Sequence, residues 1–311
     1  MTQPCLPKPH ALRANDLVNI VGTSGALNDR RRRLEAAVNV VESWGLRVRL
    51  SRHALGRWTY LSGTDAERLA DLNEALRDDE VRGIICMRGG YGVQRIVDGI
   101  DFEAVKADPK LVMGYSDITA LHAALWRETG LATIHGPTAL QLEIGPDSLR
   151  AKAAQQALMT TNPITVTADE TEGTFRIRVP GTTHGTLLGG NLTMLAATAG
   201  TRHSLDLNCA ILLIEAVNDE PYRIDRAIVQ LKRAGWFDGI QGIAIGQFTN
   251  CVDEGGPTVE EVLEEHLACL GIPIVGGLPI GHGDQQIAVG LGVTATLDAA
   301  AGTLVVDAAG R

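Results

Sequence analysis

The sequence contains little cysteine. Its five cysteines, Cys5, Cys86, Cys209, Cys251 and Cys269, are odd in number and include no Cys-x-x-Cys pair. This excludes a disulfide framework and a cysteine zinc site as the basis of the fold, and we expect the chain to work in a reducing compartment.

A long apolar segment is also missing. Residues 1–17 carry Pro, His, Arg and Asn in place of the apolar core of a signal peptide, and no apolar run elsewhere approaches the length of a membrane span. We therefore expect a cytoplasmic protein that has no membrane partner.

Positive charge is in deficit. The chain has 28 Lys and Arg against 37 Asp and Glu, a formal net charge of −9. Nucleic acids and anionic membranes favour a dense positive surface, so we expect neither as the main partner and favour small molecules or peptides. The one basic run, residues 30–33, begins a predicted helix, where a phosphate can bind but a solvated turn is the more usual arrangement.

The length and the sequence patterns of the chain are those of an α/β protein. A length of 311 residues suggests about two domains at roughly 150 residues each. In the first half, β-branched runs alternate with amphipathic stretches, as in βαβ units over a parallel sheet. Strands are predicted at residues 17–22, 46–50, 83–87, 111–114 and 131–134. Helices are predicted at residues 29–44, 65–77, 93–98, 118–128 and 148–159.

The periodicity fades between residues 160 and 185, in which 174–179 can form one strand. We therefore predict an N-terminal domain at 1–160, a linker at 161–185 and a C-terminal domain at 186–311. Strands are predicted in the last part at residues 186–188, 210–214, 240–246 and 272–275, helices near 192–199, 224–233 and 258–270, and a closing β-hairpin within 286–306.

Ser116 is the first candidate for chemistry. In Leu111-Val-Met-Gly-Tyr-Ser-Asp-Ile-Thr119 an apolar strand runs directly into a helix and leaves Ser116 at the turn. Open α/β sheets place ligands at this end of their strands, and a helix N-terminus favours a developing oxyanion. The segment is not a Gly-x-Ser-x-Gly elbow. The alternative is a helix N-cap, with the Ser116 hydroxyl bonded to the amide of Ile118 or Thr119.

A glycine-rich turn follows another predicted strand, in Ile84-Ile-Cys-Met-Arg-Gly-Gly-Tyr-Gly92. Glycines let backbone N–H groups approach a ligand closely, so the turn can supply half of an oxyanion hole. A phosphate cradle and a plain tight turn are the alternatives. The cradle is disfavoured because the Gly-x-Gly-x-x-Gly pattern and a Walker lysine are both missing.

An acid and a base stand near two further strand ends. Glu215 closes Ala210-Ile-Leu-Leu-Ile-Glu215, although a carboxylate at such a place is usually just solvated. His282, between two glycines after the strand at 272–275, is the preferred base because an imidazole exchanges protons near neutral pH. His135 can line the same cleft, whereas His122 is interpreted as packing on a helix face.

The order Ser116, Glu215, His282 is one of the known orders of nucleophile, acid and base. Nucleophile and base fall in different predicted domains. We therefore place the reaction in the cleft between the domains.

Taken together, seven segments resemble the LD-carboxypeptidase family of serine peptidases, which also includes the self-immunity peptidases that inactivate microcin C. Their joint order and spacing extend over nearly the whole chain. The segments are Tyr60-Leu-Ser-Gly-Thr64, Met87-Arg-Gly-Gly-Tyr-Gly92, Gly114-Tyr-Ser-Asp117, His135-Gly-Pro137, Gly189-Gly-Asn-Leu192, Glu220-Pro-Tyr-Arg-Ile-Asp-Arg226 and Gly281-His-Gly283.

The resemblance implies roles for particular residues. Ser116 becomes the nucleophile, Glu215 the acid and His282 the base. The oxyanion hole becomes the backbone N–H of Asp117 with an amide of Gly89 or Gly90. This chain departs from many members at Thr23-Ser24, where they have Pro-Ser, and at Ala216, where they have a second acidic residue.

The resemblance also implies a fold and an assembly. It predicts a flavodoxin-like or class I glutamine-amidotransferase-like N-terminal domain with a parallel sheet, and a smaller β-rich α/β C-terminal domain. It further implies a homodimer with no metal and no other cofactor.

The implied activity is removal of the terminal D-alanine from murein tetrapeptides in cell-wall recycling, with Arg88 as a candidate for binding the terminal carboxylate. Two alternatives stay open. An immunity-type peptidase that cleaves peptidyl or aminoacyl nucleotides needs an aromatic platform, and residues 160–190 offer only Phe175. A non-catalytic cleft-binding protein would use residues 89–92 for an anionic ligand.

Overall fold

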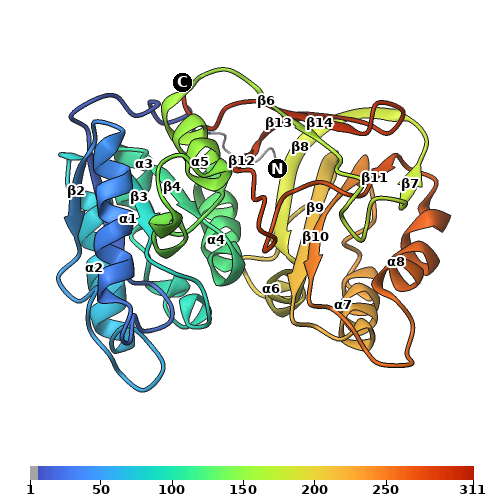
Figure 1. The fold of residues 1–311 in the computed structure, drawn as a ribbon, viewed down its shortest axis with the longest axis horizontal. Coiled ribbons are helices and arrows are strands. Elements are labelled where there is room, and N and C mark those ends of the chain that lie inside the picture. The colour runs from blue at the N-terminus through green and yellow to red at the C-terminus, as the bar shows by residue number, and fades with distance from the viewer. Residues whose placement is uncertain (1–5) are drawn as a thin grey trace.

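Two β-sheets divide the molecule (Figure 1). The structure, a computed structural model, describes residues 6–311. Cys5 lies outside the described residues, and the other four cysteines are free thiols. Among the described helices, none is long and apolar enough to cross a membrane.

The first sheet has six strands in the order β12-β5-β4-β3-β1-β2, and all neighbours are parallel except β12 and β5. The run β2-β1-β3-β4-β5 is the flavodoxin-like order. The strands are β1 (Leu17–Val21), β2 (Arg47–Leu50), β3 (Val81–Cys86), β4 (Leu111–Gly114), β5 (Thr133–His135) and β12 (Val289–Leu291).

Helices cover both faces of this sheet. On β1, Val18 and Ile20 pack in the same cluster as α1 and α5, whereas Leu17 and Val21 pack with α2 and α4. Both faces of the sheet are therefore buried, which explains why the sequences of its strands are continuous apolar runs. The helices are α1 (Arg31–Ser43), α2 (Asp65–Arg77), α3 (Phe102–Ala107), α4 (Thr119–Thr129) and α5 (Leu149–Met159), with 3₁₀ turns η1 (Val93–Arg95), η2 (Val97–Gly99), η3 (Ser116–Ile118) and η4 (Ala139–Ile144).

The second sheet has eight strands in the order β6-β14-β13-β8-β9-β10-β11-β7. Its centre, β8 to β11, is parallel, and its edges are antiparallel. The strands are β6 (Ile164–Thr167), β7 (Arg178–Val179), β8 (Thr182–Asn191), β9 (Ala210–Val217), β10 (Gly242–Thr249), β11 (Ile274–Val275), β13 (Val293–Asp298) and β14 (Thr303–Val306). Its helical elements are α6 (Leu192–Thr198), α7 (Pro221–Arg233), α8 (Val259–Leu267) and η5 (Ala268–Leu270).

The predicted fold class is confirmed: a parallel sheet forms the N-terminal part and a β-rich mixed sheet the rest. The stretch predicted as a linker, residues 161–185, contains β6, β7 and the start of β8. Two local predictions were wrong. Residues 174–179 form a strand only at Arg178–Val179. Residues 93–98 form two 3₁₀ turns in place of a helix. The bounds of the two domains stay a prediction.

The tail of the chain returns to the first sheet. A hairpin of β13 and β14 forms as predicted, but β12 pairs antiparallel with β5 in the other sheet. Arg311 then exchanges backbone hydrogen bonds with Pro9 and Ala11. In Figure 1 the red β12 accordingly lies between the two halves.

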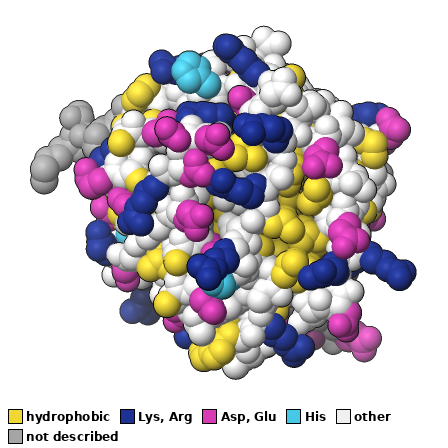
Figure 2. Space-filling model, turned by 90° about the vertical axis from the view of Figure 1, so that its left-hand side faces the viewer, with side chains coloured by type: hydrophobic (Ala, Val, Ile, Leu, Met, Phe, Trp, Pro, Cys, Tyr) yellow, Lys and Arg dark blue, Asp and Glu magenta, His cyan; other side chains and the backbone are white. Residues whose placement is uncertain are grey.

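Charged side chains are mixed on the N-terminal side of the molecule. Figure 2 shows basic and acidic groups interspersed across this face. Arg49 pairs with Asp78 at 2.5 Å and Arg77 with Asp101 at 2.6 Å, so many of these charges are locally matched.

Candidate active site

Ser116 stands in a strained turn between β4 and α4. Its φ is +65°, a left-handed conformation that a serine adopts at a cost. No side chain caps the N-terminus of η3 or of α4. The hydroxyl of Ser116 is therefore not used as a helix cap, which was the structural alternative to a chemical role.

The glycine turn after β3 lies directly against Ser116. A β-carbon on Gly89 would be 3.0 Å from Ser116 Cβ and 3.1 Å from Ser116 Oγ. Gly90 follows with φ at +121°, which also favours glycine. Backbone of the turn thus reaches the serine where a side chain would intrude.

The side chain of Asp117 connects the turn at Ser116 with two neighbouring segments. It is buried, and its Oδ2 accepts hydrogen bonds from Ser24 Oγ at 2.7 Å and from the backbone N–H of Val93 at 3.0 Å. Burial raises the pKa of the Asp117 carboxyl. One side chain thereby joins the serine turn, the loop after β1 and the glycine turn.

Glu215 and His282 form a hydrogen-bonded pair. Glu215 has no exposed surface, and its Oε2 lies 2.6 Å from His282 Nδ1. A carboxylate there accepts a hydrogen bond from Nδ1–H, which leaves Nε2 as the nitrogen that can take up a proton. Gly281 makes the approach feasible, because its φ is +135° and a β-carbon would lie 3.0 Å from Glu215 Oε2.

Tyr115 connects the serine turn with this pair. Its ring centroid is 4.4 Å from that of His282, and it meets His135 edge-on at 6.0 Å. Burial raises the pKa of Tyr115 to about 12. Within residues 6–311, no hydrogen bond joins Ser116 to His282; such contacts often tighten only when substrate binds.

The two sheets are docked close to this point. Asn191 is the register partner of Glu215, and its backbone N–H donates to Thr119 Oγ1 at 3.0 Å. The start of α4 and the end of β8 are therefore in contact. This contact holds the segment with Ser116 beside the strand that carries Glu215.

The other two histidines of this region are buried. His122 Nε2 donates to the Gly114 carbonyl at 2.9 Å, and burial lowers the pKa of His122 to about 4. Burial also lowers the pKa of His135 far below its ordinary value. Both are neutral at pH 7, in agreement with a packing role for His122.

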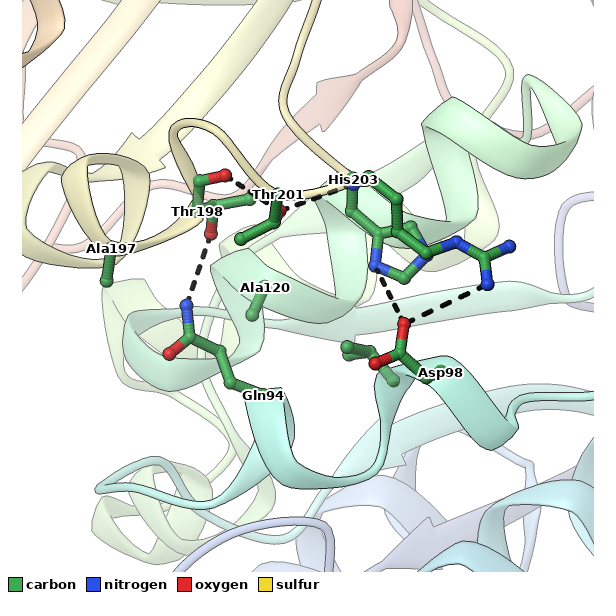
Figure 3. A pocket seen from close by; sticks show the side chains of 9 residues that line it. Gln94, Asp98, Ala120, Ala197, Thr198, Thr201 and His203 are labelled. Carbon is green, nitrogen blue, oxygen red and sulfur yellow. Dashed lines mark hydrogen bonds and ion pairs between the residues drawn. The ribbon is translucent and has the colours of Figure 1, made fainter.

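Ser116 opens into a cavity of about 210 Å³, which Arg88 and Gln141 also line. A larger cavity of about 330 Å³ lies elsewhere, where η2, α4 and the loop after α6 meet (Figure 3). There His203 and Arg202 each lie 4.0 Å from Asp98. That cavity contains none of the residues predicted to carry chemistry.

Sequence reasoning missed Gln247, on β10. Its Oε1 accepts the backbone N–H of Gly283 at 2.7 Å, and its Nε2 donates to Glu172 Oε1 at 2.6 Å. Gln247 therefore anchors the loop of His282. Gln247 is a polar residue near the end of an apolar strand, the same sequence pattern that selected Glu215 as a candidate. Its hydrogen-bond partner Glu172, however, lies in the predicted linker.

Fold and site together define a two-domain α/β hydrolase of the serine-peptidase class. Residues 18–136 match the LD-carboxypeptidase N-terminal domain, and residues 184–297 match the LD-carboxypeptidase C-terminal domain. The chain therefore belongs to the LD-carboxypeptidase family, and it is an enzyme, a carboxypeptidase.

Known relatives agree with this assignment. A probable murein peptide carboxypeptidase of Bacillus subtilis (strain 168) is 39% identical, with 97% of this chain and 94% of the relative covered. The crystal structure of a muramoyltetrapeptide carboxypeptidase from Oxalobacter formigenes superposes with a TM-score of 0.82 at 26% identity, covering 95% of this chain and 99% of the other.

A microcin C7 self-immunity protein in complex with aspartyl sulfamoyl adenosine shares the fold as well. Its TM-score is 0.85 at 23% identity, with 97% of this chain and 98% of the other covered.

Proposed function

We propose that this protein is an LD-carboxypeptidase that removes the terminal D-alanine from murein tetrapeptides. The names of the relatives support this substrate class. The observation that carries the proposal is the Glu215–His282 pair, 2.6 Å apart and in contact with Tyr115, the residue before Ser116.

In the proposed reaction Ser116 Oγ attacks the carbonyl carbon of the scissile peptide bond while His282 Nε2 takes the hydroxyl proton. The C–N bond then breaks, and His282 returns this proton to the leaving D-alanine amine. The remaining peptide is held as an ester on Ser116. Water, deprotonated by His282, hydrolyses the ester and restores the serine. Glu215 holds the imidazole and stabilises its protonated form.

The oxyanion of the tetrahedral intermediate needs preorganised donors. We assign these to the backbone N–H of Asp117 and an amide of Gly89 or Gly90. The close approach of Gly89 to Ser116 supports this assignment, as does the bond from Val93 to Asp117 that holds the two turns together. Arg88, on the wall of the same cavity, is the proposed partner of the terminal carboxylate.

We further propose that the enzyme acts as a cytoplasmic homodimer on a peptide released from the cell wall. The free thiols among the described residues support a reducing compartment. Light scattering at micromolar concentration tests the dimer: a mass near twice 33.1 kDa supports it and a mass near 33.1 kDa contradicts it.

The activity is tested with synthetic tetrapeptides that end in D-alanine or L-alanine, and with aspartyl sulfamoyl adenosine. Mass spectrometry follows the tripeptide and free alanine. We expect release from the D-alanine peptide alone. Cleavage of the sulfamoyl adenosine without cleavage of the peptide would assign the immunity-type activity, and no cleavage of either would favour a binding protein.

A further inference from the structure

The loop that carries His282 crosses from one sheet to the other. It follows β11 of the second sheet and leads into β12, which pairs with the first sheet. The loop also closes on itself, because the backbone N–H of Ile287 donates to the carbonyl of Pro279 at 2.8 Å. His282 lies inside this closed loop, so its position depends on the contacts that hold the loop in place.

Two side chains, one from each half of the molecule, hold the same residue of the loop, Gly283. From β10 in the second sheet, Oε1 of Gln247 accepts the backbone N–H of Gly283 at 2.7 Å. From α5, which packs on the first sheet, Nη2 of Arg150 donates to the Gly283 carbonyl at 2.9 Å and to the Asp284 carbonyl at 3.4 Å. A β-carbon on Gly283 would overlap the Gln247 amide, so this grip requires glycine.

The stability of α5 does not explain why an arginine stands at position 150. Arg150 lies in the first turn of this helix, where a positive charge opposes the helix dipole. Within residues 6–311 its side chain forms no ion pair, and its buried Nε makes no hydrogen bond. The guanidinium is instead held by the two carbonyls of the His282 loop, and its charge strengthens these hydrogen bonds.

Arg150 also lies close to Tyr115, the residue before Ser116. Burial is the main influence on the pKa of Tyr115 and raises it, whereas the positive charge of Arg150 acts in the opposite direction. The Tyr115 ring is in turn 4.4 Å from the His282 ring, measured between centroids. Arg150 therefore reaches the loop next to the turn that carries the serine.

We propose that Arg150 is a positioning residue for the hydrolysis proposed above. It holds the His282 loop to the half of the molecule that carries Ser116, so that the imidazole Nε2 is presented to the serine hydroxyl, while Gln247 fixes the same loop to the second sheet. The inference rests on the proposed function and adds to it a residue that acts through His282. Loss of Arg150 should therefore slow the chemical steps and leave substrate binding largely intact.

The test measures kcat and KM for a D-alanine tetrapeptide. Arg150→Met keeps the apolar stem of the side chain and removes its charge and its donors. We expect kcat to fall roughly 10- to 100-fold, with KM within about threefold of the wild-type value, because a small displacement of the base slows the reaction without weakening binding. Arg150→Lys retains a charged donor and should keep kcat within about fivefold of the wild type.

Lys152→Met is the matched control, since it makes the same change on the same helix at a side chain that is 59% exposed. It should keep the wild-type kcat. Thermal unfolding checks that each variant is folded, and Arg150→Gln, measured by the same criteria, replaces Arg150→Met if the latter does not unfold cooperatively.

Two results overturn the inference while D-alanine release by the wild type still upholds the proposed function. One is a kcat for Arg150→Met within about twofold of the wild type. The other is a rise in KM without a fall in kcat, which would show that Arg150 binds the substrate. If the wild type itself releases no D-alanine, both proposals fail.

Discussion

The carboxylate of Glu215 lies 2.6 Å from Nδ1 of His282 and is completely shielded from solvent. The hydrogen bond fixes which imidazole nitrogen carries the proton, and the negative charge stabilises the imidazolium that forms during catalysis. Both effects depend on a carboxylate.

Replacing Glu215 by Gln should therefore lower kcat strongly. The amide is neutral and can turn its NH₂ towards Nδ1, which would place the imidazole proton on the wrong nitrogen. We expect a fall of roughly 10²- to 10⁴-fold in kcat, with KM little changed. The control is Glu220→Gln, in the following loop, where the side chain is 46% exposed. A Glu215→Gln enzyme within fivefold of the wild type would contradict the assignment.

Gly89→Ala tests the contact between the glycine turn and the serine. Gly89 does not have a left-handed backbone, so alanine is tolerated locally, but its β-carbon would lie 3.0 Å from Ser116 Cβ. Displacing the serine by a few tenths of an ångström should cost about 10- to 100-fold in kcat. The control is Gly173→Ala, where a β-carbon would meet no atom within 4 Å. Equal kcat values for the two variants would show that the contact is irrelevant.

His122 should make the protein sensitive to acid. Its pKa is about 4 in the folded state and about 6.5 in an unfolded chain, so below pH 6.5 the unfolded state binds a proton that the folded state does not. Stability must therefore fall as the pH drops from about 6.5 towards 4. His122 alone should lower the free energy of unfolding by about 3 kcal/mol between pH 7 and pH 4.

Urea denaturation at pH 7, 5.5 and 4 measures this effect. His122→Gln keeps an N–H for the Gly114 carbonyl and should flatten the pH dependence, even if it lowers stability at pH 7. His10→Gln, at an exposed position, should retain the wild-type dependence. Identical slopes for wild type and His122→Gln would refute the explanation.

Part of the site can be predicted from the sequence, because several of its residues follow the ends of predicted strands. Parallel strands of one sheet end at a common edge, so Ser116 after β4 and Gly89 after β3 had to be neighbours once both strands were recognised. The same rule directed attention to Glu215, although β9 continues two residues beyond it. The roles of these residues in catalysis stay predictions.

The approach of His282 to Glu215 could not be predicted from local pattern. It depends on the left-handed backbone of Gly281 and on the bond from Gly283 to Gln247, which joins segments 36 residues apart. The pairing of β12 with β5 is similar, because alternation of apolar residues predicts a strand but does not say which sheet it enters. β6 was missed because two of its four residues are threonines in a polar stretch.

The central claim, that Ser116 is the nucleophile, is tested most directly by the rate at which wild-type enzyme and Ser116→Ala convert a D-alanine tetrapeptide to tripeptide, followed by mass spectrometry at equal concentrations of folded protein. The account predicts that Ser116→Ala loses roughly 10³-fold or more in kcat while its thermal unfolding stays cooperative. A variant that releases D-alanine within tenfold of the wild-type rate would contradict it.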